Sequence, residues 1–234
     1  LACICNVLRI AISYNSFDVL EDGYGINLRP LSMFAAKVYR DDPCERFVPH
    51  ILDENVYDAV DPGLAAKMHK AIAVIQFKVE GQLIRRYPEF GLESRMLLHH
   101  IDFERGVLEL EGKEYPMLDC NFPTVDPADP YRLSDQEQEI MDRLERAFCN
   151  CEKLQQHMRF LLAKGSLYKV YNGNLLYHGC IPLNEDGTFR NVKLWGRTYC
   201  GKELYEVLDS YVRKGFVAVD EAERERGRDT MWYI

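Results

Sequence analysis

The sequence predicts a helix-rich α/β fold, and three features of the chain support this prediction. Apolar residues recur at helical spacing in three stretches before residue 87. Asn172-Gly173 lies between two runs of apolar and aromatic residues, which is the strongest indication of a β-hairpin in the chain. Between these regions, a helix-capping sequence at Ser134 begins a long amphipathic pattern. We therefore expect helices first and a helix-flanked hairpin after them.

Two helices are expected near the start of the chain. The first is indicated by apolar residues at helical spacing, namely Val7, Ile10, Ala11 and Tyr14. The second is expected over 27–39, because Pro30 suits the first turn of a helix. Its apolar face would consist of Leu31, Phe34, Ala35 and Val38.

A third and longer helix is expected from Asp61-Pro62 to about Arg86. Its apolar stripe would consist of Leu64, Met68, Ile72, Ile75 and Val79. Pro88 ends the helix, because proline lacks the backbone donor and its ring clashes with the preceding turn.

Short strands are expected after Gly106. The residues of 107–110 and 114–115 flank Glu111-Gly112, and this pattern predicts a small β-hairpin. The segment 121–132 contains three prolines together with Asp, Asn and Thr residues, so it predicts a loop.

Ser134 and Glu137 form a capping box, and the helix that they start could extend to about Lys164. Its apolar stripe would be Ile140, Leu144, Phe148, Cys151, Leu154, Met158 and Leu161. A helix of about thirty residues is long for a globular protein. Such a helix either packs across a whole domain or reaches a partner subunit, so a homo-oligomer formed through it is one expectation.

Strands return after Gly165. Runs at 167–171 and 175–178 flank Asn172-Gly173, whose two residues readily supply the positive φ angles of a type I′ turn. A further turn at 184–187 precedes a shorter strand around 192–195. A helix from Gly201 to Lys214 follows.

Composition and charge exclude several classes of protein. Of the 234 residues, 47% are hydrophobic and 28% are charged, which is ordinary for a globular chain. The net charge of −8 argues against a nucleic-acid partner or an anionic membrane, which would require a clustered cationic face. No apolar run approaches the roughly 18 residues needed to span a bilayer.

The cysteines indicate a reducing compartment. Eight of them are spread along the chain, and the close pairs Cys3/Cys5 and Cys149/Cys151 lack the spacing of a zinc knuckle. We expect buried, reduced thiols in a cytoplasmic protein and no signal peptide. Position 1 is Leu rather than Met, and the chain ends in the apolar run 231–234, so we also expect an internal piece of a longer protein.

Most of the histidines are expected to be structural. His50, His69 and His157 are isolated in the sequence, and an imidazole is tolerated at helix surfaces. His99-His100 with Asp102 forms a closer group, but adjacent side chains point in different directions and cannot easily bind one metal. No catalytic triad can be assigned from spacing alone.

Two other motifs have both an ordinary and a functional interpretation. His178 ends a predicted strand and precedes Gly179, which would allow close approach of a ligand; an ordinary strand-end histidine is favoured. The Gly-rich turn 22–25 precedes Arg29 at a helix start, where backbone N–H groups could bind phosphate; a structural turn is favoured. The segment 221–229 alternates acidic residues with arginines and is expected to be a solvated surface segment.

Several blocks of the sequence resemble one family of enzymes. They are residues 1–7, 20–31, 41–44 and 167–183, together with Gly196, Arg197, Tyr199, Gly201 and Lys202. These blocks are similar to the central stretch of class III (Firmicutes-type) fructose-1,6-bisphosphatases, and the resemblance extends over all 234 residues. It implies a calcineurin-like metallophosphoesterase fold with a large helical insertion. Residues 1–28 and 166–234 would belong to the phosphoesterase core, and 29–165 to the insertion.

The resemblance also implies an activity. Such an enzyme hydrolyses fructose 1,6-bisphosphate to fructose 6-phosphate and phosphate in gluconeogenesis, with a divalent metal that is usually manganese. Bound metal would also offset the acidic charge of the chain towards an anionic substrate. Of the family's metal motifs only His178-Gly179 falls inside the chain, and Arg29 is the expected phosphate-facing residue, because a guanidinium fits phosphate in a bidentate manner. The chain alone is therefore expected to be inactive.

Two alternatives remain open at this point. One is a non-catalytic helical interaction or regulatory module built around the helix expected at 134–164. The other is a calcineurin-like phosphatase that acts on a nucleotide or a phosphoprotein.

Overall fold

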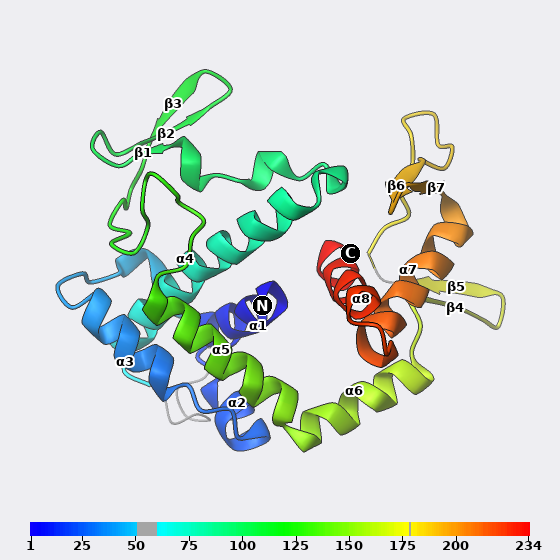
Figure 1. Ribbon diagram of the computed structural model, residues 1–234, viewed down its shortest axis with the longest axis horizontal. Helices are drawn as coiled ribbons and strands as arrows, with labels where there is room; N and C mark the ends of the chain where they lie inside the picture. The colour runs from blue at the N-terminus through cyan, green and yellow to red at the C-terminus, as the bar shows by residue number, and fades with distance from the viewer. Residues whose placement is uncertain (51–59, 178) are drawn as a thin grey trace. The chain divides into compact units, whose positions relative to one another are not determined.

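A computed structural model describes residues 1–50, 60–177 and 179–234, and the chain separates into two compact units (Figure 1). Unit 1 comprises 1–86 and 92–155, and unit 2 comprises 87–91 and 156–234. The described residues form eight α-helices and three small antiparallel sheets. The predicted helix-rich α/β class is confirmed at this level, whereas the calcineurin-like arrangement and the division at residues 28 and 165 stay predictions.

Unit 1 is built around one long helix, α4 (Pro62–Arg86). Against it pack α1 (Ala2–Ser13) and α3 (Arg29–Val38), and α5 (Asp135–Asn150) packs on α3 (Figure 1). Short 3-10 turns at Glu45–Phe47, Glu93–Arg95 and Leu98–His100 join these elements. Helix α4 is buried on most of its surface, because its apolar residues occupy several faces rather than one narrow stripe. The predicted second and third helices are thus confirmed.

Helix α1 forms where it was expected, but a different face of it is buried. The buried residues are Ala2, Cys5, Leu8 and Ile12, whereas Val7, Ile10 and Tyr14 are exposed. Apolar residues surround most of this helix, so the spacing alone permits two stripes. The stripe that includes the small residues Ala2 and Cys5 is the one that is buried.

A short helix that was not predicted, α2 (Phe17–Tyr24), follows α1. Gly25 ends it with φ 68°, and its N–H bonds to the carbonyl of Glu21. The N–H of Ile26 bonds to the carbonyl of Leu20, so two carbonyls at the end of α2 are satisfied. The Gly-rich turn at 22–25 is therefore a helix C-cap, in agreement with the favoured structural interpretation.

The first predicted hairpin is confirmed. Strand β2 (Val107–Leu110) pairs with β3 (Lys113–Pro116), and β1 (Ile101–Asp102) adds a third short strand. Glu111 and Gly112 both have positive φ, as a type I′ turn requires. The loop expected over 121–132 contains no helix or strand.

The single long helix predicted from Ser134 is wrong, although its start is confirmed. The capping box of Ser134 and Glu137 is present, but α5 ends at Asn150 and α6 (Glu152–Lys164) begins after a break. Cys151 is extended at the break, with ψ 101°, and its thiol lies 3.2 Å from the carbonyl of Tyr24. The ammonium of Lys153 also donates to the carbonyl of Gly23 at 2.8 Å. Contacts with the end of α2 thus stabilise the break between α5 and α6, which helical periodicity could not predict.

Unit 2 contains two hairpins, two complete helices and most of α6. Its other elements are β4 (Tyr168–Tyr171), β5 (Asn174–Tyr177), β6 (Val192–Leu194), β7 (Arg197–Tyr199), α7 (Gly201–Val217), α8 (Glu221–Tyr233) and the 3-10 turn Pro88–Phe90. Asn172 and Gly173 have φ angles of 50° and 75°, and Tyr171 pairs with Asn174 across the turn. The Asn-Gly hairpin, the short strand near 192–195 and the helix from Gly201 are therefore confirmed.

The segment 221–229 is mostly exposed, as expected of a solvated surface segment, but it also forms a helix that was not predicted. The side chain of Asp220 caps α8 by accepting from the N–H of Glu223 at 2.9 Å. Most of α8 is exposed, but Gly227 and Thr230 are buried. A Cβ on Gly227 would lie 2.2 Å from the backbone nitrogen of Gly215, so α7 and α8 touch through their backbones. Glycine at this contact is required for the helices to approach so closely.

The core of unit 2 is largely aromatic. Phe90 stacks on Tyr233 with ring centroids 4.3 Å apart, and Trp195 lies edge-on to Tyr87 and Phe90. The indole N–H of Trp195 donates to the Thr230 hydroxyl at 3.1 Å. This satisfies the polar end of the ring while its body remains packed.

Candidate functional site

Arg29, the predicted phosphate-facing residue, is the first residue of α3 and is exposed. Its N–H donates to the side-chain oxygen of Asn27 at 2.8 Å. The N–H of Leu28 donates to the Glu21 carboxylate at 3.1 Å. The backbone N–H of Arg29 is thus already hydrogen-bonded, and the Glu21 carboxylate lies nearby. Both features disfavour the binding of an anion at this helix start. The guanidinium of Arg29 as a phosphate ligand stays a prediction.

His178, the predicted metal ligand, lies outside the described residues. Elsewhere in the described chain, no group of three or more His, Cys, Asp or Glu side chains is placed to hold a metal ion. The described residues therefore do not fit a manganese centre by themselves. A metal centre of this enzyme class would need ligands from other parts of the protein.

Two other predicted structural histidines, His69 and His99, have hydrogen-bond partners. Nδ1 of His69 lies 3.0 Å from the Phe47 carbonyl. Burial lowers the pKa of His69, although the hydrogen bond to this carbonyl acts in the opposite direction. His99 has Nδ1 2.8 Å from the Tyr131 hydroxyl, and burial again lowers its pKa. Asp102 is occupied elsewhere, since it accepts from the N–H groups of Glu104 and Arg105. The group of His99, His100 and Asp102 is thus not a metal site.

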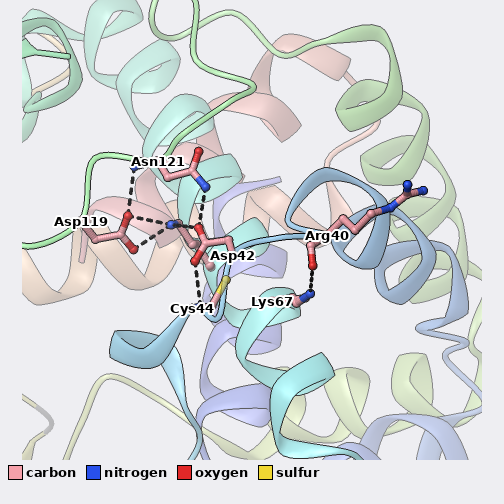
Figure 2. A network of polar contacts seen from close by, with 7 residues as sticks. Arg40, Asp42, Cys44, Lys67, Asp119 and Asn121 are labelled. Atoms are coloured by element: carbon pink, nitrogen blue, oxygen red, sulfur yellow. Dashed lines mark hydrogen bonds and ion pairs between the residues drawn. The ribbon is translucent and has the colours of Figure 1, made fainter. Parts of the chain in front are cut away.

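The most concentrated arrangement of charge in unit 1 surrounds Lys70 of α4, which is fully buried. Its ammonium donates to Asp42 at 2.6 Å and to the two carboxylate oxygens of Asp119 at 2.8 and 2.7 Å. Figure 2 shows Asp42, Asp119 and Asn121 converging on this point. The Asn121 amide donates to Asp42 at 2.7 Å, and the N–H of Cys44 does so at 2.8 Å. We call these five residues the Lys70 cluster.

The electrostatics of the Lys70 cluster stabilise the carboxylate form of Asp42. Burial alone would raise the pKa of Asp42, but hydrogen bonds from Lys70, Cys44 and Asn121 outweigh it and lower the pKa to about 2. For the Cys44 thiol, burial and the negative charge of Asp42 act together and raise the pKa to about 12. Cys44 is therefore an inert thiol at neutral pH.

A surface cavity of about 390 Å³ lies against the Lys70 cluster. Its lining residues are Asp41, Asp42, Pro43, Glu45, Arg46, Leu118, Asp119 and Asn121. The Lys70 ammonium has three donors, and all three are used by Asp42 and Asp119. It therefore has no donor left for a phosphate. The cluster ties the segments around 42 and 119 to α4, and its role is structural.

A second lysine of α4, Lys78, is also fully buried. It donates to Glu137 at 2.7 Å and to the Thr124 carbonyl at 2.6 Å. Burial lowers the pKa of Lys78, and the bond to Glu137 opposes this shift. Glu137 also accepts from the N–H of Ser134, so the capping box of α5 is joined to α4.

The two buried lysines were missed by sequence reasoning, although a signal was present. Apolar residues of α4 occupy several of its faces, so a lysine in its middle turns can be buried and must then be paired. Their partners come from 42, 119 and 137 and could not be identified from spacing, because these positions lie 28, 49 and 59 residues away.

Unit 2 contains an apolar cavity of about 310 Å³ between the β4–β5 hairpin and the start of α7. It is lined by Tyr168, Val170, Leu175, Tyr177, Ile181, Phe189, Gly201, Lys202 and Tyr205. The Tyr205 hydroxyl donates to the Cys180 carbonyl at 3.1 Å. Nearly all of the lining is apolar, so this cavity suits hydrophobic groups rather than acid–base chemistry.

Comparison with known proteins gives a consistent result along the whole chain. The profile of the Firmicute fructose-1,6-bisphosphatase family matches residues 1–234. Proteins named fructose-1,6-bisphosphatase class 3 from Clostridium novyi and Clostridium tetani are 49% and 50% identical to the chain. A protein of the same name from Bacteroides fragilis is 50% identical. No solved structure matches the chain.

The matched region is the whole of this chain but only part of each relative. Each of these three relatives aligns with all of this chain, but the aligned part is 35% of the relative's own length. The chain thus spans about a third of the curated relatives that it matches. Since the family profile covers every residue, the chain belongs to the Firmicute fructose-1,6-bisphosphatase family.

Proposed function

We propose that this chain is part of a fructose-1,6-bisphosphatase. The proposal rests on one observation, the match of the family profile to the whole chain, which is supported by relatives about 50% identical. The reaction would convert fructose 1,6-bisphosphate and water to fructose 6-phosphate and phosphate, as a step of gluconeogenesis in the cytoplasm. The substrate would be a sugar bisphosphate.

The Lys70 cluster contributes structure rather than chemistry to this activity. The Lys70 cluster has its donors occupied, and no metal-binding group occurs among the residues that the structure describes. We therefore propose that the 234 residues alone do not turn over substrate. The metal requirement, with manganese as the expected ion, rests on the resemblance alone.

We propose His178 as a metal ligand and Arg29 as a phosphate ligand of a longer protein that carries this sequence. In that protein His178→Ala should lower both bound manganese and turnover by orders of magnitude, because it removes a ligand. His157→Ala is the matched control, since we expect His157 to be structural. Near-normal metal content and turnover in His178→Ala would refute the role of His178.

The substrate is tested by comparing phosphate release from three compounds by the longer protein. These are fructose 1,6-bisphosphate, a nucleoside monophosphate and a phosphoserine peptide. A preference for the sugar bisphosphate by a large factor in kcat/KM supports the proposal. A preference for either of the others would support the alternative phosphatase. A regulatory module built on one continuous helix is disfavoured, since α5 and α6 are separated at Cys151.

A further inference from the structure

The β4–β5 hairpin of unit 2 exposes an unusual number of apolar side chains. Over 167–183 the only Asp, Glu, Lys or Arg residue is Lys169, although such residues make up 28% of the chain. In the strands, Val170 is 63% exposed, Tyr171 61% and Leu176 54%. Soluble proteins rarely leave a contiguous apolar surface of this kind uncovered.

Both faces of this hairpin expose apolar side chains. In the antiparallel register Val170 lies opposite Leu175, and Tyr168 lies opposite Tyr177. Paired residues share a face, so these four lie on the face that lines the 310 Å³ cavity. Tyr171 and Leu176 occupy the alternate positions, and therefore the opposite face, which they share with Lys169 and Asn174. Exposed apolar side chains on both faces favour a sheet that is covered on both sides.

The hairpin is also too small to be a complete sheet. Among the described residues β4 and β5 pair only with each other. An isolated two-stranded hairpin is at best marginally stable in water. Further strands at its edges would supply the missing pairing, and layers on both sides would cover the two faces.

The length of the relatives indicates what covers the hairpin. They are about three times as long as the matched region, since that region is 35% of each. A symmetric contact with a second copy would bring identical patches together and cover one face. It would leave the other face in water. Additional chain of the same protein can cover both.

We propose that the β4–β5 hairpin is an internal part of a larger sheet. Chain that lies outside these 234 residues in the longer family proteins covers both of its faces. Apolar side chains of that chain fill the cavity between the hairpin and α7. The proposal rests on family membership and on the exposed hairpin, so it can fail or hold independently of the catalytic activity.

Hydrogen exchange with mass spectrometry tests the proposal. Peptides covering 168–177 are compared between the 234-residue chain and the aligned hairpin of the intact Clostridium tetani relative. We expect exchange in the intact relative to be slower by about 100-fold or more, because covered strands open only through larger unfolding events. The β2–β3 hairpin is the internal control and should exchange at similar rates in both proteins. Equal rates at 168–177 would overturn the proposal.

The result differs if a second copy of the chain covers the hairpin. Sedimentation of the 234-residue chain over a wide range of concentration would then show a dimer. That dimer would slow exchange at 168–177, would be lost in Leu176→Glu, and would persist in Val219→Glu. Val219 is the matched control, because it is exposed in unit 2 but lies outside the hairpin. Such a dimer would overturn the proposal; we expect both variants to sediment like the unchanged chain.

Discussion

The two units differ in how far their own residues complete them. In unit 1, helix α4 is buried along most of its length, and both of its buried lysines are paired with carboxylates. In unit 2, the buried apolar residues of the described chain are Phe90, Leu194, Leu204 and Tyr205. The core of unit 1 is therefore completed by residues of this chain, whereas unit 2 has a small core and an exposed hairpin.

The two hairpins show the same contrast. The β2–β3 hairpin carries Glu109, Glu111, Lys113 and Glu114, which suit a surface in water. The strands of the β4–β5 hairpin carry Lys169 as their one charged residue. Both hairpins nevertheless have two-residue turns with positive φ angles, so the same kind of turn occurs in a charged hairpin and in an apolar one. The flanking residues, and not the turn, decide whether the strands belong at a surface or inside a larger sheet.

The largest effect is expected from breaking the Lys70 cluster. Lys70→Ala should destabilise unit 1 by about 3 kcal/mol, because Asp42 and Asp119, whose side chains are only 10% and 20% exposed, would lose their cation. Lys67→Ala is the control on the same helix, since its ammonium donates to the Arg40 carbonyl at an exposed position (Figure 2). It should cost about 1 kcal/mol or less. Urea unfolding followed by circular dichroism measures both; equal costs would contradict the role of the cluster.

A smaller effect is expected at the helix contact of unit 2. Gly227→Ala should cost about 1–3 kcal/mol, because the new Cβ would meet the backbone of Gly215 and force α7 and α8 apart. Tryptophan fluorescence reports this, since Trp195 and Trp232 are the two tryptophans and both lie in unit 2. Gly23→Ala is the control, because its Cβ would make an ordinary 3.6 Å contact. It lies in unit 1, so circular dichroism measures the cost of both substitutions. A neutral Gly227→Ala would show that the helices do not touch there.

The pH dependence of unit 1 should follow Asp42. Because its pKa in the folded protein is lowered to about 2, its contribution is complete above the ordinary carboxyl range and is lost as the pH falls towards 2. Asp42→Asn should therefore cost about 1–2 kcal/mol at pH 7. That difference should shrink between pH about 4 and 2. Unfolding of both proteins at several pH values checks this, and a difference that grows towards acid would contradict it.

The smallest effect is expected on the exposed hairpin. Val170→Thr should change the stability of the 234-residue chain by less than about 0.5 kcal/mol, because this side chain is already largely in water. Val79→Thr in unit 1 is the contrasting substitution, since Val79 is buried in α4 and its new hydroxyl would lack water. Similar costs at the two positions would remove the distinction between the units.

Helices and strands were predicted correctly where the residues of one short segment determine the local structure. Asn172-Gly173 fixes its turn through two positive φ angles, and Ser134 with Glu137 fixes the start of α5. Predictions failed where distant residues decide. The break at Cys151 depends on a carbonyl of α2, more than a hundred residues earlier. The capped helix α8 was missed because its surface is mostly charged, and its packing depends on Gly227.

The candidate site was less accessible to sequence reasoning than the fold. The burial of Lys70 and Lys78 could have been inferred from the apolar surroundings in α4, but their acidic partners come from distant loops and from α5. Arg29 was located at a helix start, as expected, without any contact there that would identify its ligand. His178 was singled out through resemblance and lies outside the described residues.

We propose that these 234 residues form part of a bisphosphatase whose chemistry needs the longer chain. The most direct test of this proposal is phosphate release from fructose 1,6-bisphosphate, with manganese in excess, by the 234-residue chain and by the intact Clostridium tetani relative. We expect turnover in the common enzyme range of about 1–10³ s⁻¹ for the relative. For the 234-residue chain we expect none above the blank. Turnover in that range by the 234-residue chain would contradict the account.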